Sequence, residues 1–533
     1  MQSLYRLAPI ASVRTLGAGL VAWILLSGTL QANEFTWAGA AGEFDWNAGA
    51  NWVDAVAPPS AVDTVLIFND SAGETGSGAN PLNQNIADPM DVDRLEIQSG
   101  AYVIGGDAIR LNASGGVGIR LDSTAAVAIQ NDLILGADAA INWQAGALAS
   151  HLTVGGDIDL GAHTLRLITL NQHRDFTFDG VISGTGAIRI SGHVFGPDFA
   201  FNEANTFSGG VFTEEGDRVG GRILLGADNA LGTGRIDLAH RDAATALVEI
   251  AAEGGPRALD NDFRFSTRSS TSQPHSRTLF SGGSLTLNGD LELNSDNTIN
   301  HTYLDVAEGT TVTVNGVIKD LGTSESKREL RLRGDGTFVF TSENHTYAGE
   351  TLVGLEAGGQ TVTLQVDGDI TSSSGVLVHA DATLRGTGSV PETTVESGGI
   401  LYPGSSVGTL TVEGMVNMND GSILQIDIED DQAGRVAIMG TGNHMDLTLG
   451  NVTLNITGTL GTAPYTIVTW EDPNADYGGF FEVQLDGDAA AWDATGWEVS
   501  YGDTSIMLIP EPGTLVLLLG GGLTLLAYRR SRV

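Results

Sequence analysis

The stretch SLTLNGDLELN, residues 284–294, decides how this chain folds. Its apolar residues alternate with polar ones, which is typical of β-strands with one buried face. The same alternation recurs in LRLITL from Leu165, TTVTVNG from Thr310, TVTLQVDGDI from Thr361 and VTLNITGTL from Val452. Gly, Asn, Asp and Ser separate these runs, and no stretch after residue 33 has the pattern of an amphipathic helix. The sequence therefore predicts an all-β protein.

The spacing of the strands narrows the architecture. A new strand is expected about every 8 to 12 residues, which suits a sandwich, a barrel or a stacked solenoid. About 480 residues share this pattern, more than the usual 200 to 250 of one sandwich or barrel. We therefore expect a parallel β-solenoid with coils of about 20 to 25 residues, and a rod on the order of 80 to 95 Å long.

The composition excludes several classes of protein. The chain has 65 acidic and 26 basic residues, and Lys319 and Lys327 are its only lysines. Nucleic-acid binding needs clustered basic residues, so no nucleic-acid partner is expected. Cysteine is absent, which rules out disulfides, thiol nucleophiles and cysteine-based zinc sites.

The N-terminal segment has the order of a secretory signal peptide. Arg6 and Arg14 precede an apolar run, residues 16–30, which leads to the small residue Ala32. We expect residues 1–32 to be removed by cleavage after Ala32. An uncleaved N-terminal anchor is the alternative, and the rest of the chain is exported in either case.

The C-terminal segment combines a proline motif, an apolar run and a basic end. Pro510, Glu511 and Pro512 are expected to end any strand and to present an extended backbone. Residues 514–528 then form an apolar run of about 22 Å as a helix, short for a hydrocarbon core of ~30 Å. The last basic residues, which the positive-inside rule places in the cytoplasm, are Arg529, Arg530 and Arg532.

This C-terminal order resembles the PEP-CTERM sorting signal. Exported proteins of Gram-negative bacteria that make exopolysaccharide carry this signal, and an exosortase processes it. The resemblance implies that residues 510–533 hold an intermediate at the inner membrane before the protein reaches the surface or matrix. A plain tail anchor is the alternative.

Two stretches look like copies of one repeat. DGVISGTGAIRISG from Asp179 and ANTFSGGVFTEEG from Ala204 parallel NGVIKDLG from Asn315 and RGDGTFVFTSENHTYAGETLVG from Arg333. This set resembles the autotransporter-associated β-strand repeat of bacterial surface proteins. Segments beginning at Ala382 and Phe35 extend the resemblance. It implies a right-handed parallel β-helix.

These observations divide the chain into five parts. We expect a signal peptide at 1–32, an N-terminal cap with the first strands at 33–100, a β-solenoid at 101–440, a C-terminal β region at 441–509 and the sorting signal at 510–533.

The catalytic motifs that the sequence contains lack their structural context. Ser406 lies in GSSVG, but a strand rather than the required helix is expected to follow. HRD at His240 lacks the other kinase motifs. Asp430 and Asp431 are adjacent, so on a strand they would point to opposite faces, and we expect them in a solvated turn. No catalytic residue is assigned.

No cofactor is expected, because the histidines lack the spacing of a zinc site. Acidic turns such as VDGDI from Val366 and MNDGS from Met418 can at most bind Ca²⁺ weakly. Three tryptophans, Trp37, Trp46 and Trp52, are either buried in an N-terminal cap or exposed for stacking on a sugar, and we favour the cap.

The sequence thus predicts an exported, non-enzymatic surface or extracellular-matrix protein. Its expected partners are an exosortase-type enzyme, exopolysaccharide or the cell envelope, and the membrane through the C-terminal helix. The alternatives are a β-helical polysaccharide lyase or glycosidase and a carbohydrate-binding adhesin. An enzyme would need Asp or Glu and Arg or Lys side chains that converge from successive coils.

Overall fold

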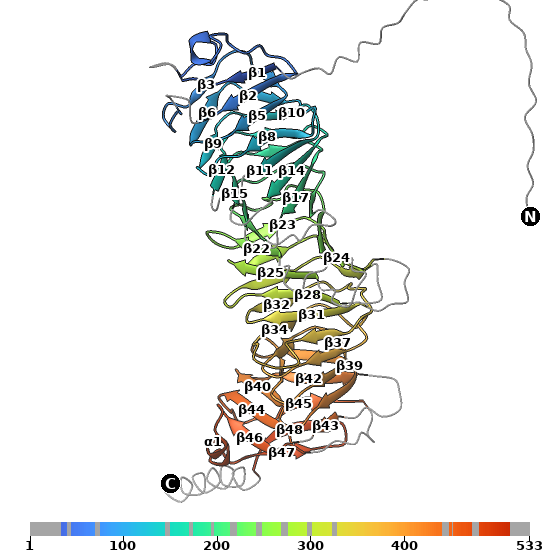
Figure 1. The fold of residues 1–533 in the computed structure, drawn as a ribbon. Helices are drawn as coiled ribbons and strands as arrows, with labels where there is room; N and C mark the ends of the chain where they lie inside the picture. Colours follow the sequence, from blue (N-terminus) through green and yellow to red (C-terminus); the bar gives the residue numbers. More distant parts are fainter. Residues whose placement is uncertain are drawn as a thin grey trace, which may run out of the picture.

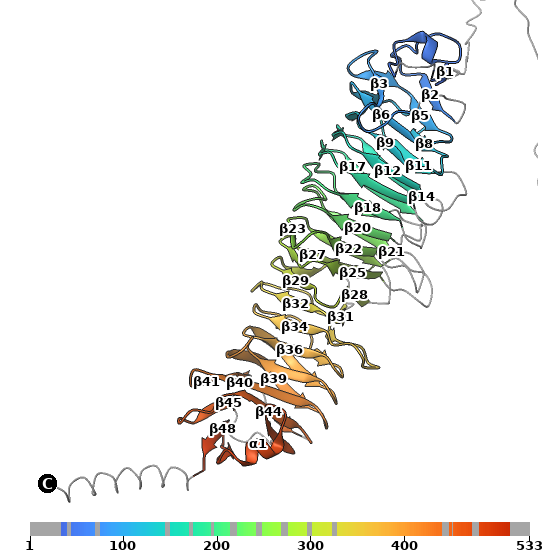
Figure 2. The same ribbon diagram turned by 90° about the vertical axis from the view of Figure 1, so that its left-hand side faces the viewer.

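The structure is a computed structural model that describes residues 33–511, apart from 40–43, 70–74, 144–149, 170–173, 193–196, 214–220, 241–247, 268–275, 296–300, 322–327, 440–446, 450 and 472–478. Strands stack along one axis into an elongated rod (Figures 1 and 2). The predicted signal peptide with Ala32 lies outside the described residues. So do Pro512, the apolar run and the three terminal arginines.

The rod is a parallel β-solenoid in which each coil adds a strand to two or three sheets. Sheet A is twelve-stranded and belongs to the first part of the chain. It contains β1 (Asn33–Thr36), β2 (Thr64–Phe68), β5 (Arg94–Ile97), β8 (Val117–Leu121), β11 (Ala139–Trp143), β14 (Thr164–Thr169), β17 (Ala187–Gly192), β19 (Val211–Thr213), β21 (Ile236–His240), β24 (Phe263–Thr267), β27 (Leu291–Ser295) and β30 (Ile318–Asp320).

Sheet B runs from one end of the rod to the other, and its strands pair in parallel up to β45. It contains β3 (Leu82–Gln84), β6 (Tyr102–Gly106), β9 (Val127–Ile129), β12 (Ser150–Val154), β15 (Arg174–Phe178), β18 (Asp198–Phe201), β20 (Gly221–Leu225), β22 (Val248–Ala252), β25 (Ser276–Gly282), β28 (His301–Val306), β31 (Glu329–Gly334), β33 (Thr351–Val353), β35 (Val376–Val378), β37 (Ser389–Val395), β39 (Thr409–Met418), β42 (Arg435–Met439), β43 (Leu447–Leu449), β45 (Tyr465–Thr469), β47 (Trp497–Tyr501) and β48 (Ser505–Pro510).

Sheet C forms the third side in a five-stranded and an eleven-stranded segment. The first segment contains β4 (Met90–Val92), β7 (Ile109–Leu111), β10 (Leu133–Leu135), β13 (Ile158–Asp159) and β16 (Ile182–Ser183). The second contains β23 (Arg257–Leu259), β26 (Leu285–Leu287), β29 (Thr311–Val314), β32 (Thr337–Phe340), β34 (Thr363–Val366), β36 (Thr383–Gly386), β38 (Ile400–Pro403), β40 (Ile423–Glu429), β41 (Gln432–Ala433), β44 (Thr453–Gly458) and β46 (Glu482–Leu485).

Alternating burial produces this arrangement. In β29, Val312 and Val314 are buried and the two threonines are half-buried, as the period of two requires. Side chains that point inward from every coil join one apolar core along the rod. The all-β, parallel solenoid architecture is therefore confirmed. One five-residue helix, α1 (Ala489–Asp493), is the only α-helix in the described part of the chain.

The coils vary in length more than a uniform repeat would. Leu165 pairs with Ile188 on the next coil, which is close to the expected repeat. A shorter coil joins Thr383 to its partner Ile400. A longer one joins Ile423 to its partner Thr453. Local turns and insertions therefore set each coil separately.

The two predicted repeat copies adopt the same local structure. In the first, the buried Asn205 side chain accepts a hydrogen bond from the Ile182 backbone N–H at 2.6 Å. In the second, His345 Nδ1 accepts from the Ile318 N–H at 2.9 Å. In both copies a threonine follows this side chain in the sequence. The backbone N–H of Thr206 donates to the Ile182 carbonyl, and that of Thr346 donates to the Ile318 carbonyl, each at 2.9 Å. The alignment of the two copies thus holds at the level of individual hydrogen bonds.

Aromatic residues close both ends of the rod. Trp37, Trp46 and Trp52 are at most 2% exposed and pack on Phe68, so the predicted burial in an N-terminal cap is confirmed. At the other end β48 pairs antiparallel with β45 and β47. There the rings of Trp497 and a buried tyrosine of β45 stack at 5.5 Å.

The expected division at residues 100 and 440 stays a prediction. Parallel pairing runs across both positions, from β5 to β8 and from β42 to β45.

Candidate functional site

Charged side chains converge from three successive coils on the outer face of sheet B. Strands β25, β28 and β31 lie next to one another, and the outward residues of β28 stand opposite those of β31: His301 opposite Glu329, Tyr303 opposite Arg331 and Asp305 opposite Arg333. The period of two turns the residues at 301, 303 and 305 to the same face. We call these six residues, with Arg277 of β25, the Tyr303 cluster.

Asp305 is the centre of the ion pairs in the Tyr303 cluster. Its side chain is only 2% exposed and accepts hydrogen bonds from Arg277 Nε and, at 2.9 Å, from Arg333 Nε. The Arg333 guanidinium carbon also lies 4.4 Å from the centre of the Tyr303 ring, a cation–π contact. Asp305 therefore forms ion pairs with two arginines, one from the coil on each side.

A second group of ion pairs surrounds Glu329. Its Oε2 atom accepts from Arg331 Nη2 at 2.6 Å and lies 2.7 Å from His301 Nδ1. On the next coil, burial raises the pKa of the Glu350 carboxyl above its usual value, and the nearby Glu329 carboxylate adds to the effect. Arg331 and His379 oppose that rise in the pKa. Glu350 can therefore hold a proton at a higher pH than an ordinary glutamate.

The chemistry of the Tyr303 cluster is that of a polar surface whose own charges are paired. Guanidinium groups and a tyrosine ring can bind a sugar or an anion, and Glu350 on the next coil, outside the cluster, can donate a proton. No motif in the sequence points directly to this cluster. The segments HTYLDV of β28 and ELRLRG of β31 alternate charged and apolar residues. They face each other because 28 residues separate the paired positions, and that number depends on the length of the coil between them.

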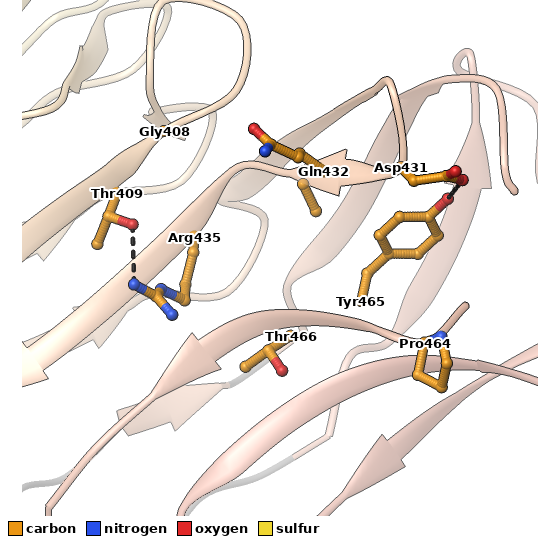
Figure 3. Close-up of a pocket in the computed structure, with 9 residues that line it drawn as sticks. Gly408, Thr409, Asp431, Gln432, Arg435, Pro464, Tyr465 and Thr466 are labelled. Atoms are coloured by element: carbon orange, nitrogen blue, oxygen red, sulfur yellow. Dashed lines mark hydrogen bonds between the residues drawn. The ribbon is translucent and has the colours of Figure 1, made fainter.

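An open recess of about 430 Å³ lies near the C-terminal end of sheet B (Figure 3). Arg435 points into it and donates from Nη2 to Thr409 Oγ1 at 3.1 Å. On the opposite side, the Tyr465 hydroxyl accepts from the Gly461 N–H at 2.7 Å and donates to Asp431 at 3.5 Å. The recess thus offers one guanidinium, one carboxylate and two threonine hydroxyls, the second from Thr466.

The sequence motifs with a catalytic appearance stay apart. Ser406 lies in a bend before β39, a strand, and donates to Glu429 Oε2 at 2.8 Å. Asp430 and Asp431 form the exposed turn between β40 and β41, both with positive φ, as the expectation of a solvated turn requires. His240 ends β21, and the other two residues of HRD lie outside the described residues.

The acidic turns considered for weak calcium binding make hydrogen bonds within the fold. Asp420 of MNDGS accepts from the Asn451 backbone N–H at 2.9 Å and from its side chain at 3.1 Å, which ties two neighbouring coils together. Asp367 of VDGDI accepts from the Gln365 amide at 2.6 Å. No group of three or more His, Asp or Glu side chains is placed to hold a metal ion in the described part of the chain.

The sorting motif begins inside the fold. Pro510 is the last residue of β48 and stands opposite Trp497 of β47, so the strand ends at the motif's first residue rather than before it. The Glu511 N–H donates to the Gly496 carbonyl at 2.8 Å. A proline fits here because β48 ends with it. No helix among the described residues is long and apolar enough to span a bilayer.

Comparisons with known proteins found no match: no family model, curated protein or solved structure is similar to this chain.

Proposed function

We propose that this protein is an exported, non-enzymatic component of the cell surface or extracellular matrix, and that its working part is a rod that spaces or supports other molecules. The observation that carries the proposal is the uninterrupted parallel pairing from β3 to β45 around one core. Such a solenoid keeps its shape because every coil packs on its neighbours. Parallel strand connections are almost always right-handed, so we infer right-handed coils.

The C-terminal segment serves as a temporary membrane address in this proposal. A signal peptide directs export, the apolar run 514–528 holds the intermediate at the inner membrane, and an exosortase-type enzyme cuts at the Pro-Glu-Pro motif. Because Glu511 is still bonded to the fold, the motif lies directly at the end of the rod. The released rod then joins the exopolysaccharide or envelope at the surface.

Intact-mass measurement of the protein from its native host tests this proposal. We expect the surface form to lack residues 1–32 and the C-terminal tail. Replacing Pro510, Glu511 and Pro512 with alanines keeps the backbone pairing with Trp497 available, so the rod should still fold. It should accumulate uncleaved in the membrane fraction. A surface form that still ends at Val533 would refute processing, and a compact particle in small-angle scattering would refute the rod.

A polysaccharide lyase or glycosidase is the second candidate, and the Tyr303 cluster favours it because acids and bases converge there from successive coils. Paired charges such as Asp305 with its two arginines also stabilise a sheet without catalysis. Assays of the purified protein on acidic polysaccharides decide between the two. Product that forms with the wild type and disappears with Glu350→Gln would establish the enzyme and overturn the structural proposal.

A further inference from the structure

One outward column of side chains runs along sheet A over seven successive coils. Strand register places its members opposite one another in the order Arg166, Arg189, Phe212, Asp237, Arg264, Glu292 and Lys319. They belong to β14, β17, β19, β21, β24, β27 and β30, and the first two of these strands are labelled in the upper half of Figure 1. We call this set the sheet A column.

In the second part of the sheet A column, from Asp237 to Lys319, the charges of the side chains are paired with one another. Arg264 lies 2.8 Å from Glu292 and 3.9 Å from Asp237, and Lys319 lies 3.6 Å from Glu292. Lys319 also bonds Asp290 at 2.8 Å, which raises the pKa of the lysine. Opposite charges alternate here from coil to coil, as cross-strand stability favours.

The alternation breaks in the first part of the sheet A column. Arg189 stands between a second arginine, Arg166, and Phe212, so neither neighbour in register supplies a carboxylate. Its guanidinium carbon lies 5.5 Å from the centre of the Phe212 ring. Arg189 is exposed, and no described carboxylate comes within ion-pair distance of it. Arg166 has an interaction of its own, so Arg189 is the guanidinium of this part of the column that is open to an approaching anion.

We propose that Arg189, flanked by Arg166 and Phe212, forms a binding site for the anionic groups, carboxylate or sulfate, of an acidic polysaccharide that lies along the rod. Guanidinium groups bind such groups with two parallel hydrogen bonds. The Phe212 ring holds the Arg189 guanidinium in place and offers an apolar surface to the sugar. Successive strands are about 4.8 Å apart, so the column presents its groups in a row along the axis. The inference rests on the proposed function, because it names the matrix partner of the rod.

The acidity of the whole chain does not prevent this binding. The formal net charge is −39, but at physiological ionic strength charges more than about 8 Å away are largely screened. The nearest acid in the column, Asp237, is within reach of Arg235 at 3.7 Å and of Arg264. The exposed guanidinium of Arg189 therefore attracts an anion that approaches this part of the column.

Binding measurements on the full mature chain test the site. The probe is an oligogalacturonate long enough to cross three coils, with a neutral dextran of equal length as the negative probe. We expect the oligogalacturonate to bind, the affinity to fall with salt, and the dextran not to bind. Arg189→Gln should weaken binding about tenfold, Phe212→Ala a few-fold, and Arg189→Lys less than Arg189→Gln.

Arg110→Gln is the matched control, because it removes the same charge from another sheet, where Arg110 pairs with Asp91 at 3.4 Å. Its affinity should stay within about twofold of the wild type. Absence of binding by the wild type, or an equal loss in Arg110→Gln and Arg189→Gln, would overturn the site. A competition experiment with dextran sulfate then distinguishes the anion. If dextran sulfate displaces the oligogalacturonate, the site binds sulfate as well as carboxylate. If it does not, the site binds carboxylate alone. Arg189→Gln leaves the rod and its processing unchanged, so failure here is distinct from failure of the proposed function.

Discussion

The solenoid has two regions that differ in the number of sheets around the core. Up to Asp320 the coils contribute to sheets A and B, and most of them add a strand to sheet C, so we call this part the three-sheet region. Sheet A ends at β30, and the described strands beyond it belong to sheets B and C, which form the two-sheet region.

The shortest coils of the rod lie in the two-sheet region. In the last coil of sheet A, Leu291 pairs with Ile318. In the two-sheet region Thr363 pairs with Thr383, which in turn pairs with Ile400, so fewer residues separate each partner from the next. The coil from Ile423 to Thr453 in the same region is longer, so the loss of sheet A does not by itself set the length of a coil.

The core also differs between the stacked rings of the three-sheet region and one long stretch of the two-sheet region. In the three-sheet region Phe176 and Phe178 stack on Phe199 and Phe201 of the next coil, with ring centres 5.5 and 5.2 Å apart. Between residues 348 and 464 the sequence has a single aromatic residue, Tyr402, and it faces outward. Over this stretch the core is filled mainly by Val, Leu and Ile. The buried aromatic residues of the two-sheet region lie on either side of it, for example Phe338 of β32 and the Tyr465–Trp497 pair near the C-terminal end.

Removing a stacked ring should have the largest effect on this comparison. Phe199→Ala leaves a cavity in the three-sheet region and should lower the free energy of unfolding by about 3–5 kcal/mol. Val378→Ala in the two-sheet region removes two methyl groups and should lower it by about 2 kcal/mol. Urea denaturation followed by circular dichroism measures both. Equal losses would show that the two regions are packed alike.

The first coils of the two-sheet region are closely packed at Gly349, just before β33. A Cβ atom there would lie 1.5 Å from the Arg328 carbonyl oxygen, closer than any backbone can tolerate. Gly349→Ala should therefore lower the free energy of unfolding by about 3 kcal/mol. Gly78 has open space around its Cβ position, so Gly78→Ala should change stability by less than about 1 kcal/mol. Thermal melts compare the two variants, and a mild effect at Gly349 would mean that the chain before β33 can shift.

The two repeat copies should respond differently to pH. Burial lowers the pKa of His345 to about 4, so the unfolded chain, with an ordinary histidine pKa near 6.5, takes up the proton first. Stability from this group is complete above pH 6.5 and is lost as the pH falls towards 4. At pH 5 the loss is about 2 kcal/mol.

His345→Asn copies the residue that the first repeat has at the equivalent position, Asn205, and cannot titrate. Asp320, whose pKa burial raises, is common to both proteins and cancels in their difference. Melting curves between pH 7 and 4 should therefore depend less on pH in the variant than in the wild type. Parallel pH profiles would show that His345 is hydrated and titrates normally.

The smallest change in the free energy of unfolding should come from removing charged side chains on the outer faces of the sheets. Arg264 in the three-sheet region pairs with Glu292, and their side chains are 23% and 11% exposed. Arg264→Gln should lower the free energy of unfolding by up to about 1 kcal/mol, and less in high salt. Arg435 in the two-sheet region has no carboxylate within ion-pair distance among the described residues. Arg435→Gln should thus cost less in the same denaturation experiment, and the reverse order would contradict the role given to the ion pairs of sheet A.

Period-two alternation was enough to predict strands and their inward faces, and the length of the patterned stretch favoured a solenoid. The cap followed from Trp37, Trp46 and Trp52, because a stacked array needs its last coil covered. The repeat alignment also anticipated that Asn205 and His345 are equivalent. These features depend on local pattern, which a single sequence carries.

The candidate sites were not predictable in the same way. The meeting of Asp305 with Arg277 and Arg333, and of Arg189 with Arg166, requires the length of every coil between them. Those lengths vary from coil to coil and depend on turns that alternation does not determine. The final reversal of strand direction at β47 and β48 was missed for the same reason, and with it the place of Pro510 as the last residue of a strand.

The covered ends also determine how copies of this rod behave towards each other. An open parallel coil is a template on which an identical chain can add strand after strand, as in amyloid. Here the backbone of β1 is crossed by the loop that carries Trp52, where the Val53 N–H donates to the Thr36 carbonyl at 2.9 Å. At the other end β47 runs antiparallel to its neighbour, so a further parallel coil finds no matching partner. Rods at high concentration should consequently remain separate molecules and not fuse end to end into fibrils.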